Sequence, residues 1–544
     1  MNAAAENQKK FWGPGKTLAL IFAGALVLRV LLVLTRQMIQ LDETAYVRMA
    51  ENLASGNGLL DITGLTSTHF SPLLPFFIAG VAAIVRNFIL AAYIVVVVFG
   101  ALVTIPGFLL GKEMGGNRVG LALAALLAVT PVLVDNSTLI YTESLYVFFL
   151  LIAIVFGRHM LLGCRIPCGT LAGGALGLAY LDNPSAVFYF VALLLLALAV
   201  AWRRGIWRQM GKALLFFAVF FLVYAIPYVV FLHAELGKWT YSGKSPGNIY
   251  TASRNLRAGT LDWEKDLMSL VDNGTQIKIL QLQDSDDPAS SLIHSPVQGA
   301  RIFIRQSYIF YNEVISQVFP LWLLPLLGLG LFAQGWSRRR AAAVGYLLIM
   351  MIPALLILTM YAYSRFFIPF VPLVMLWVAH GWLRLEDWGA ETVDIVFQQP
   401  RSRRYRRWAP WVIGAAVLLP LLLYSVANVV RQSYPVGYKY AGELIRQEDG
   451  SGHRIMSREY SAAYYAGGTA VMLPYADYEA TTRYARLQHV DFLVIRKQEL
   501  LDWRPTLARL LGDASQHPEW ALAGTADPGT SGETLIFRLV PATR

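Results

Sequence analysis

The chain has 544 residues, of which 56% are hydrophobic and only 15% charged; a wholly soluble protein, with about a quarter of its residues charged, is therefore excluded. Its apolar residues are concentrated in runs of about 15 to 24 residues, the length that crosses a bilayer as a helix. The net charge of +11 does not indicate a nucleic-acid partner, because the basic residues gather between apolar runs, as in the cytoplasmic loops of membrane proteins.

Eleven spanning helices are predicted, with the N-terminus in the cytoplasm and the C-terminus outside. The first is interpreted as a retained helix, because its apolar run is too long for the core of a signal peptide. In this arrangement the basic segments 203–212, 338–340 and 401–407 all lie on the cytoplasmic side. The predicted spans are 17–36, 88–111, 119–134, 145–162, 169–182, 186–202, 213–233, 318–334, 341–361, 366–383 and 408–430.

The apolar stretch 71–85 is not assigned as a span. It begins with Pro72 and Pro75 and ends at Arg86. If it crossed the membrane, every later loop would change sides and the arginine clusters would face outward. We therefore predict a re-entrant or surface-lying juxtamembrane helix within the first external loop, 37–87.

After residue 430 the composition becomes that of a soluble domain. Strands are expected at 454–456, 470–473, 490–495 and 535–540, and helices at 478–486 and 506–511. The predicted fold is thus an all-α membrane domain, residues 1–430, followed by a small periplasmic α/β domain, residues 431–544.

Charged residues that could carry chemistry are predicted at the outer ends of the spans. Cationic side chains there could bind the phosphate of a lipid whose isoprenoid tail stays in the bilayer. A carboxylate could take the proton from an incoming hydroxyl or amine. A lipid phosphate becomes a tolerable leaving group once cationic side chains neutralise the charge of the phosphate. These residues are Asp42, Glu43, Glu143, Lys238, Lys244 and Arg365.

The pattern resembles the membrane glycosyltransferases of the GT-C fold, and most of all the protein O-mannosyltransferase superfamily with the aminoarabinose transferases of lipid A. The residues that carry the resemblance are Asp42-Glu43 followed by Tyr46, the run Gly56-Asn57-Gly58, the prolines Pro72 and Pro75, the acidic Glu143, and the run Arg365 to Pro372. In three places the chain departs from the family pattern. His69-Phe70-Ser71 stands where His-Pro-Pro is frequent, Glu143 where many members have Asp, and Asp182 where many bacterial relatives have a basic residue.

The resemblance implies inverting transfer of a hexose or pentose from a polyprenyl-phosphate donor, on the periplasmic face of a bacterial inner membrane. The acceptor could be a lipid, a glycan or a protein. Asp42 matches the catalytic acidic position and is predicted to be the base, assisted by Glu143 and Glu43. Arg365, Lys244 and Lys238 are predicted to bind the donor phosphate, and Tyr46, His69 and Tyr363 to contact substrate. Some members use a divalent cation, which is possible here, but the sequence demands no metal.

Other interpretations of these residues stay open. The carboxylates could be solvated helix ends, or could complement a helix dipole. Arg365 could extend to the interface, the tyrosines could belong to an aromatic belt, and His69 could be a hydrogen-bonded structural residue. Arg29, inside the first span, could form a structural ion pair or contact substrate.

The alternative function is a transporter or flippase for a lipid-linked saccharide. A transporter would place ionisable groups near mid-membrane on several helices, whereas these lie at external ends. A non-catalytic assembly protein would leave unexplained why acidic and basic residues collect at one edge.

Overall fold

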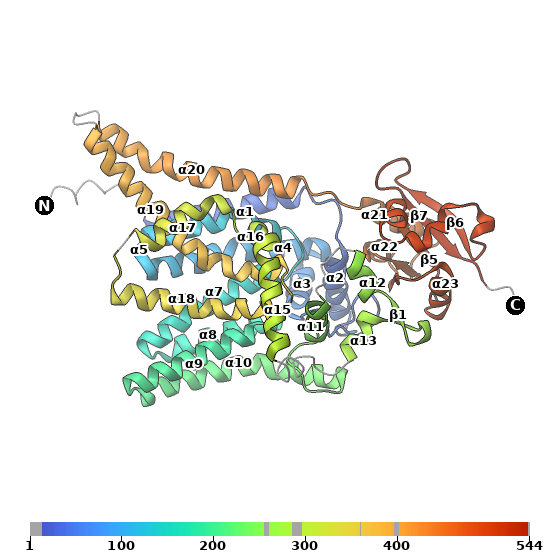
Figure 1. Ribbon diagram of the computed structural model, residues 1–544, viewed down its shortest axis with the longest axis horizontal. Coiled ribbons are helices and arrows are strands. Elements are labelled where there is room, and N and C mark those ends of the chain that lie inside the picture. The colour runs from blue at the N-terminus through green and yellow to red at the C-terminus, as the bar shows by residue number, and fades with distance from the viewer. Residues whose placement is uncertain are drawn as a thin grey trace.

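The computed structural model describes residues 13–254, 261–284, 296–333, 335–359, 361–396 and 402–541. A bundle of long helices carries a small α/β domain at one end (Figure 1). Of the basic residues considered above, Arg401 lies outside the described residues.

The described chain contains eight helices long and apolar enough to cross a membrane, or nine if a bent pair, Pro296–Val318 with Leu321–Phe332, is one span. The protein is therefore a multi-pass membrane protein. The helices that form these candidates are α1 (Pro14–Val33), α4 (Phe88–Leu102), α5 (Thr104–Val129), α7 (Glu143–Gly163), α9 (Ala186–Arg204), α10 (Trp207–Leu236), α17 (Leu324–Phe332), α18 (Arg338–Leu356), α19 (Val371–Val396) and α20 (Ser402–Val430).

The number of eleven spans remains a prediction, and two features explain why it differs from eight or nine. The continuous segment 88–129 reverses direction at Gly116, whose φ is 85°. Gly111 then lies against Gly120, so that an added Cβ would be 2.8 Å from the Gly120 Cα. In addition, α8 (Ile166–Asp182) has 17 residues, which is short for a spanning helix.

α8 packs closely along α10 because three glycines, four residues apart, face it. A Cβ added at Gly169, Gly173 or Gly177 would come within 2.3, 2.1 or 2.6 Å of α10 atoms. Small residues at this spacing allow two membrane helices to approach closely. This close packing fixes the position of the C-terminal end of α8, which carries Asp182.

Two short helices, α2 (Leu41–Ala54) and α3 (Leu73–Val85), follow α1. With 13 residues, α3 is too short to span, and it packs on α2 and α4. Figure 1 shows α2 and α15 (Pro296–Ile309) running across the direction of the long helices.

The segment after α10 contains several short elements: α11 (Ser245–Arg254), α12 (Leu261–Leu267), β1 (Leu270–Val271), β2 (Gln276–Ile277), α13 (Lys278–Asp284) and α15. It is fastened to the C-terminal domain by the fully buried Glu264, which pairs with Arg504 and lies 2.8 Å from the Arg458 Nε. The backbone N–H of Tyr475 also donates to the Met268 carbonyl at 2.7 Å.

The C-terminal domain has a five-stranded sheet in the order β4-β3-β5-β7-β6. The strands β3 (Arg454–Ser457), β4 (Thr469–Met472) and β5 (Phe492–Arg496) are parallel, whereas β7 (Thr534–Leu539) runs antiparallel to β5 and β6 (Trp520–Ala526). The four expected strands are confirmed. β6 and the helix α21 (Val436–Glu448) were not predicted from the sequence. The expected helix 506–511 is a 3₁₀ helix, Pro505–Leu511.

Gly173→Ala is expected to destabilise the α8–α10 pair by about 1–3 kcal/mol, because the new methyl group would overlap the Phe217 carbonyl. Gly174→Ala is the matched control, since its Cβ would meet only the Phe220 ring, at 4.0 Å. Thermal unfolding of the two variants in detergent measures the difference. Equal unfolding temperatures would contradict the close packing.

Candidate active site

Arg365 joins two carboxylates that are far away in the sequence. Its Nη1 donates to Asp42 Oδ2 at 2.9 Å, across 323 residues, and its Nε donates to Glu143 Oε1 at 2.7 Å, across 222 residues. The guanidinium carbon lies 3.9 Å from the centre of the Tyr141 ring, a cation–π contact. Three of the predicted site residues therefore form one cluster at the end of the bundle that faces the C-terminal domain.

Local structure places each member of this cluster. Asp42 lies in the first turn of α2 and Glu143 is the first residue of α7, where the positive end of the helix dipole favours a carboxylate. Arg365 lies in the 3₁₀ helix Ser364–Phe370, which leads into α19. The three segments meet because the Arg365 side chain neutralises both acids.

Asp42 stays ionised in this environment. Burial alone would raise the pKa of its carboxyl, but the charges of Arg365 and Lys244 outweigh burial and lower that pKa. For Lys244, burial lowers the pKa of the ammonium group and Asp42 opposes that change. Burial and Lys244 lower the pKa of His69 to about 3, so His69 is neutral at pH 7.

Glu43 faces the backbone, not the cluster. Its carboxylate accepts the N–H of Ile140 and the N–H of Gln40, each at 2.7 Å, and so completes a capping box at the start of α2. Burial raises the pKa of Glu43 to about 7. Its position indicates a residue that ties α2 to the chain segment that carries Tyr141.

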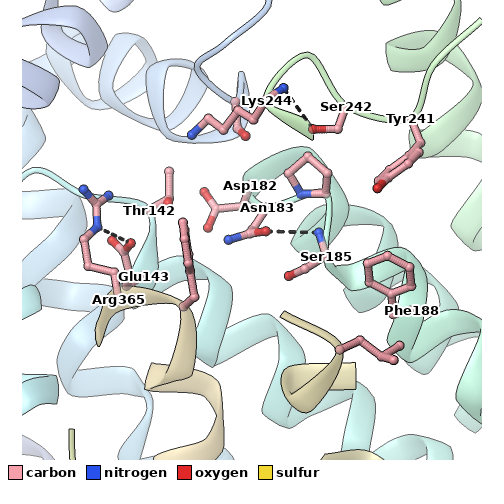
Figure 2. A pocket seen from close by; sticks show the side chains of 14 residues that line it. Thr142, Glu143, Asp182, Asn183, Ser185, Phe188, Tyr241, Ser242, Lys244 and Arg365 are labelled. Atoms are coloured by element: carbon pink, nitrogen blue, oxygen red, sulfur yellow. Dashed lines mark hydrogen bonds and ion pairs between the residues drawn. The ribbon is translucent and has the colours of Figure 1, made fainter. Parts of the chain in front are cut away.

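A cavity of about 90 Å³ opens beside the cluster (Figure 2). Lys244 extends across it towards Arg365, and the Lys244 Nζ lies 5.5 Å from the centre of the Phe70 ring. The cavity is lined by Ser71, Thr142, Glu143, Asp182, Asn183, Pro184, Ser185, Phe188, Tyr241, Ser242, Lys244, Leu356, Arg365 and Phe366.

Asp182 is a site residue that the sequence analysis did not select. It was noted there as a departure from the family pattern, and that difference was the signal that could have identified it. Asp182 is the last residue of α8 and only 1% exposed, and neither of its carboxylate oxygens accepts a hydrogen bond from the described part of the chain.

A second cavity, of about 490 Å³, lies on the other face of Arg365. Its walls are mostly amide and hydroxyl side chains from α6 (Pro131–Asn136), α20 and the segments on either side of them. They include Gln40, Asn136, Tyr141, Gln317, Tyr363, Asn428 and Gln432. Arg365 therefore separates a charged cavity from a larger, polar and mostly uncharged one.

The remaining predicted residues lie around the cluster. Tyr46 is 1% exposed and packs edge-on against Phe70 with ring centres 5.2 Å apart, and the His69 ring also packs edge-on against Phe70, with ring centres 5.1 Å apart. Tyr363 stacks on Tyr361 and lines the second cavity. Lys238 is six residues before Lys244 and is not among the residues that line either cavity in the described ranges.

The described residues contain no group of three His, Cys, Asp or Glu side chains able to hold a metal ion. The Arg365 guanidinium already bonds to one oxygen of Asp42 and one of Glu143, the two acids that could be bridged by a divalent cation. The residues present therefore do not fit a resident metal, and no step below uses one.

Comparison with known proteins agrees with this architecture. A family described as dolichyl-phosphate-mannose-protein mannosyltransferase matches residues 69–231, a segment that includes Glu143 and Asp182. No curated protein sequence matches the chain. Among solved structures, ArnT from Cupriavidus metallidurans bound to undecaprenyl phosphate superposes with a TM-score of 0.58 at 14% identity, covering 96% of this chain and 98% of that one. The chain has a GT-C fold.

A second GT-C structure supports this assignment. The oligosaccharyltransferase AglB from Archaeoglobus fulgidus, in complex with an inhibitory peptide and a dolichol-phosphate, superposes with a TM-score of 0.54 at 14% identity, covering 97% of this chain and 75% of that one. The GT-C resemblance inferred from the sequence is thus confirmed for the fold.

Arg365→Met is expected to lower the free energy of unfolding by about 1–3 kcal/mol, because it leaves Asp42 and Glu143 without their cation. The matched control is the triple variant Arg365→Met, Asp42→Asn, Glu143→Gln, which removes the charges together. Unfolding in detergent should show the triple variant to be more stable than the single one. The opposite order would contradict the pairing.

The raised pKa of Glu43 predicts that the stability of the protein depends on pH. Between pH 4.5, the ordinary value, and about 7 the unfolded chain loses this proton before the folded chain does, so stability falls as pH rises through this window. The full change is on the order of 3 kcal/mol. Glu43→Gln should flatten the unfolding temperature over this range. A slope equal to that of the wild type would contradict the assignment.

Proposed function

We propose that the protein is a glycosyltransferase that moves one sugar from a polyprenyl-phosphate carrier to a lipid, glycan or protein acceptor at the periplasmic face of a bacterial inner membrane. The observation that carries the proposal is the bonding of Arg365 to both Asp42 and Glu143 at the mouth of a cavity that also contains Lys244. The phosphate of the donor, the Asp42 carboxylate and the acceptor can come together at this position, at the boundary between membrane and water.

The proposed donor site is the cavity between Lys244 and Arg365. In the described part of the chain, the Arg365 Nε and Nη1 bond to carboxylates and no bond to Nη2 is present, which leaves an N–H group for a phosphate oxygen. Lys244 supplies a point charge from the opposite wall. Lys238, six residues earlier, remains an additional candidate for contact with the lipid phosphate as it approaches.

Donor binding would also prepare the base. While Asp42 is paired with Arg365 its pKa is lowered, and a carboxylate of lowered pKa is a weak proton acceptor. A phosphate that binds Arg365 competes with Asp42 and weakens this ion pair. The pKa of Asp42 then rises towards its ordinary value, so that Asp42 becomes a better base when the donor is in place.

In the proposed reaction, the acceptor oxygen attacks the anomeric carbon on the face opposite the phosphate, which inverts the configuration. Asp42 takes the acceptor's proton as the new bond forms. The bond between the anomeric carbon and the phosphate oxygen breaks, its electron pair stays on the phosphate, and Arg365 and Lys244 neutralise the developing charge. Glu143 holds Arg365 in position through the 2.7 Å bond to Nε.

The second cavity is the proposed approach of the acceptor. It meets Arg365 from the other side and includes Gln40, the residue that caps the helix of Asp42. Its amide and hydroxyl side chains suit a hydroxylated acceptor, and Tyr363 at its wall is the candidate substrate contact. The donor and the acceptor would thus reach Asp42 from separate sides.

The proposed orientation is supported by the ends of the helices. The basic pairs and triplets at the end of α9 and the start of α18, Arg203, Arg204 and Arg338 to Arg340, lie at the opposite ends of these helices from the site. By the positive-inside rule this end faces the cytoplasm and the site faces the periplasm.

Asp42→Asn is expected to reduce sugar transfer by about 10²-fold or more, because it removes the base, while binding of undecaprenyl phosphate is retained or becomes tighter as the competitor for Arg365 loses its charge. Purified protein in lipid nanodiscs would be incubated with labelled undecaprenyl-phosphate sugars and candidate acceptors. Asp61→Asn, which alters a half-buried carboxyl group outside both cavities, is the control.

Equal transfer rates for Asp42→Asn and the wild type would exclude Asp42 as the base. In proteoliposomes, movement of the lipid-linked sugar across the bilayer with no covalent product would favour the transporter instead.

A further inference from the structure

Asp182 is a buried carboxylate that the proposed transfer step does not use. It is 1% exposed; the backbone N–H of Tyr146 faces it, but among the described residues neither carboxylate oxygen accepts a hydrogen bond of good geometry. Asp42 and Glu143, in contrast, are each bonded to Arg365. An unpartnered buried carboxyl group opposes folding, and a ligand that donates hydrogen bonds to Asp182 would offset this cost.

The place of Asp182 in the fold makes a structural role less favourable still. It is the last residue of α8, where the negative end of the helix dipole opposes a carboxylate. The helix stops there because Pro184 follows, and Asn183 turns the chain by accepting the Ser185 N–H at 3.0 Å. The turn presents Asp182 and Asn183 side by side.

Both side chains reach the donor cavity. Figure 2 shows Asp182 between Glu143 and Asn183, directed into the space below Lys244, with the Asn183 amide nitrogen turned the same way. Farther along the same cavity, the Phe188 and Tyr241 rings meet at 73° with their centres 6.2 Å apart. The wall thus combines a carboxylate, an amide and an aromatic surface.

The chemistry of this wall favours a hydrogen-bond donor at Asp182 over a phosphate, because a phosphate and a carboxyl group both present acceptor oxygens. Lys244 already supplies a cation to the cavity. Asp182 therefore lacks hydrogen-bond donors more than it lacks a nearby positive charge. Two neighbouring hydroxyl groups can donate to its two oxygens. The Asn183 amide can donate to a further hydroxyl, and the aromatic rings can pack on the C–H face of a ring.

We infer that Asp182 and Asn183 bind adjacent hydroxyl groups of the donor's sugar and determine which sugar the protein accepts. This inference rests on the proposed function, because a sugar joined to a phosphate between Lys244 and Arg365 lies in the same continuous cavity. The expected sugar is a neutral hexose or pentose with a vicinal diol. We expect it to be preferred over an amino sugar, which would bind Asp182 through its amino group.

The test measures binding, not turnover. Full-length protein in nanodiscs is titrated with undecaprenyl-phosphate mannose, undecaprenyl-phosphate glucose, undecaprenyl-phosphate 4-amino-4-deoxyarabinose, and the methyl ester of undecaprenyl phosphate. The methyl ester is a diester with the charge of a neutral-sugar donor and no sugar. The quantity of interest is the Kd of the methyl ester divided by the Kd of each sugar-bearing lipid. This ratio isolates the contribution of the sugar to binding.

In the wild type, at least one neutral sugar is expected to strengthen binding about tenfold over the methyl ester. Asp182→Ala should abolish this advantage without weakening the binding of the methyl ester, because that lipid has no sugar hydroxyl groups. Asp182→Asn, which keeps one acceptor, should retain part of it. Asp61→Asn should behave as the wild type, and thermal unfolding of each variant verifies that it is folded.

An equal sugar advantage in the wild type and Asp182→Ala would overturn the inference, as would an Asp182-dependent advantage confined to the amino sugar. Failure of the proposed function is distinguishable: the Asp182-dependent binding difference would persist while no acceptor became glycosylated.

Discussion

The pairing of one guanidinium with two carboxylates governs the architecture of the outer end of the bundle. Asp42, Glu143 and Arg365 come from three separate segments, and none of them could be placed in this partly dehydrated region alone. Together they fix the start of α2, the start of α7 and the approach to α19. The same arrangement keeps Arg365 turned towards two cavities, so the interaction that stabilises the site also divides it.

The convergence of these three residues could be predicted from the sequence because each lies close to one end of a strongly apolar run, and the positive-inside rule puts those ends on one side. Details finer than a helix end could not be predicted. Asp42 and Glu43 are neighbours, yet successive residues of a helix point about 100° apart, so only Asp42 meets Arg365 while Glu43 meets the backbone. Lys244 and Lys238 were also indistinguishable in sequence. The turn in which Ser242 Oγ accepts the Lys244 N–H brings Lys244 to the cavity.

The parts of the fold that the sequence did not reveal are those that depend on partners. β6 contains alanines and a glycine, which have little preference for strands, and it forms because it pairs with β7. The short elements between α10 and α15 likewise contain too few apolar residues to be recognised alone. They are organised around Glu264, whose two arginine partners lie about 200 residues further along the chain. Asp182 was not selected because a lone carboxylate at a helix end forms no motif; its departure from the family pattern was the one sequence signal, and its burial in the described structure identifies it.

The order in which the cluster's members are synthesised has a consequence for biogenesis. Asp42 and Glu143 leave the ribosome 323 and 222 residues before Arg365, and until it arrives neither carboxylate has the guanidinium to which it bonds. The early helices therefore cannot close into their final arrangement while the chain is short. Completion of this end of the bundle must wait for the segment between α18 and α19, because that segment carries Arg365.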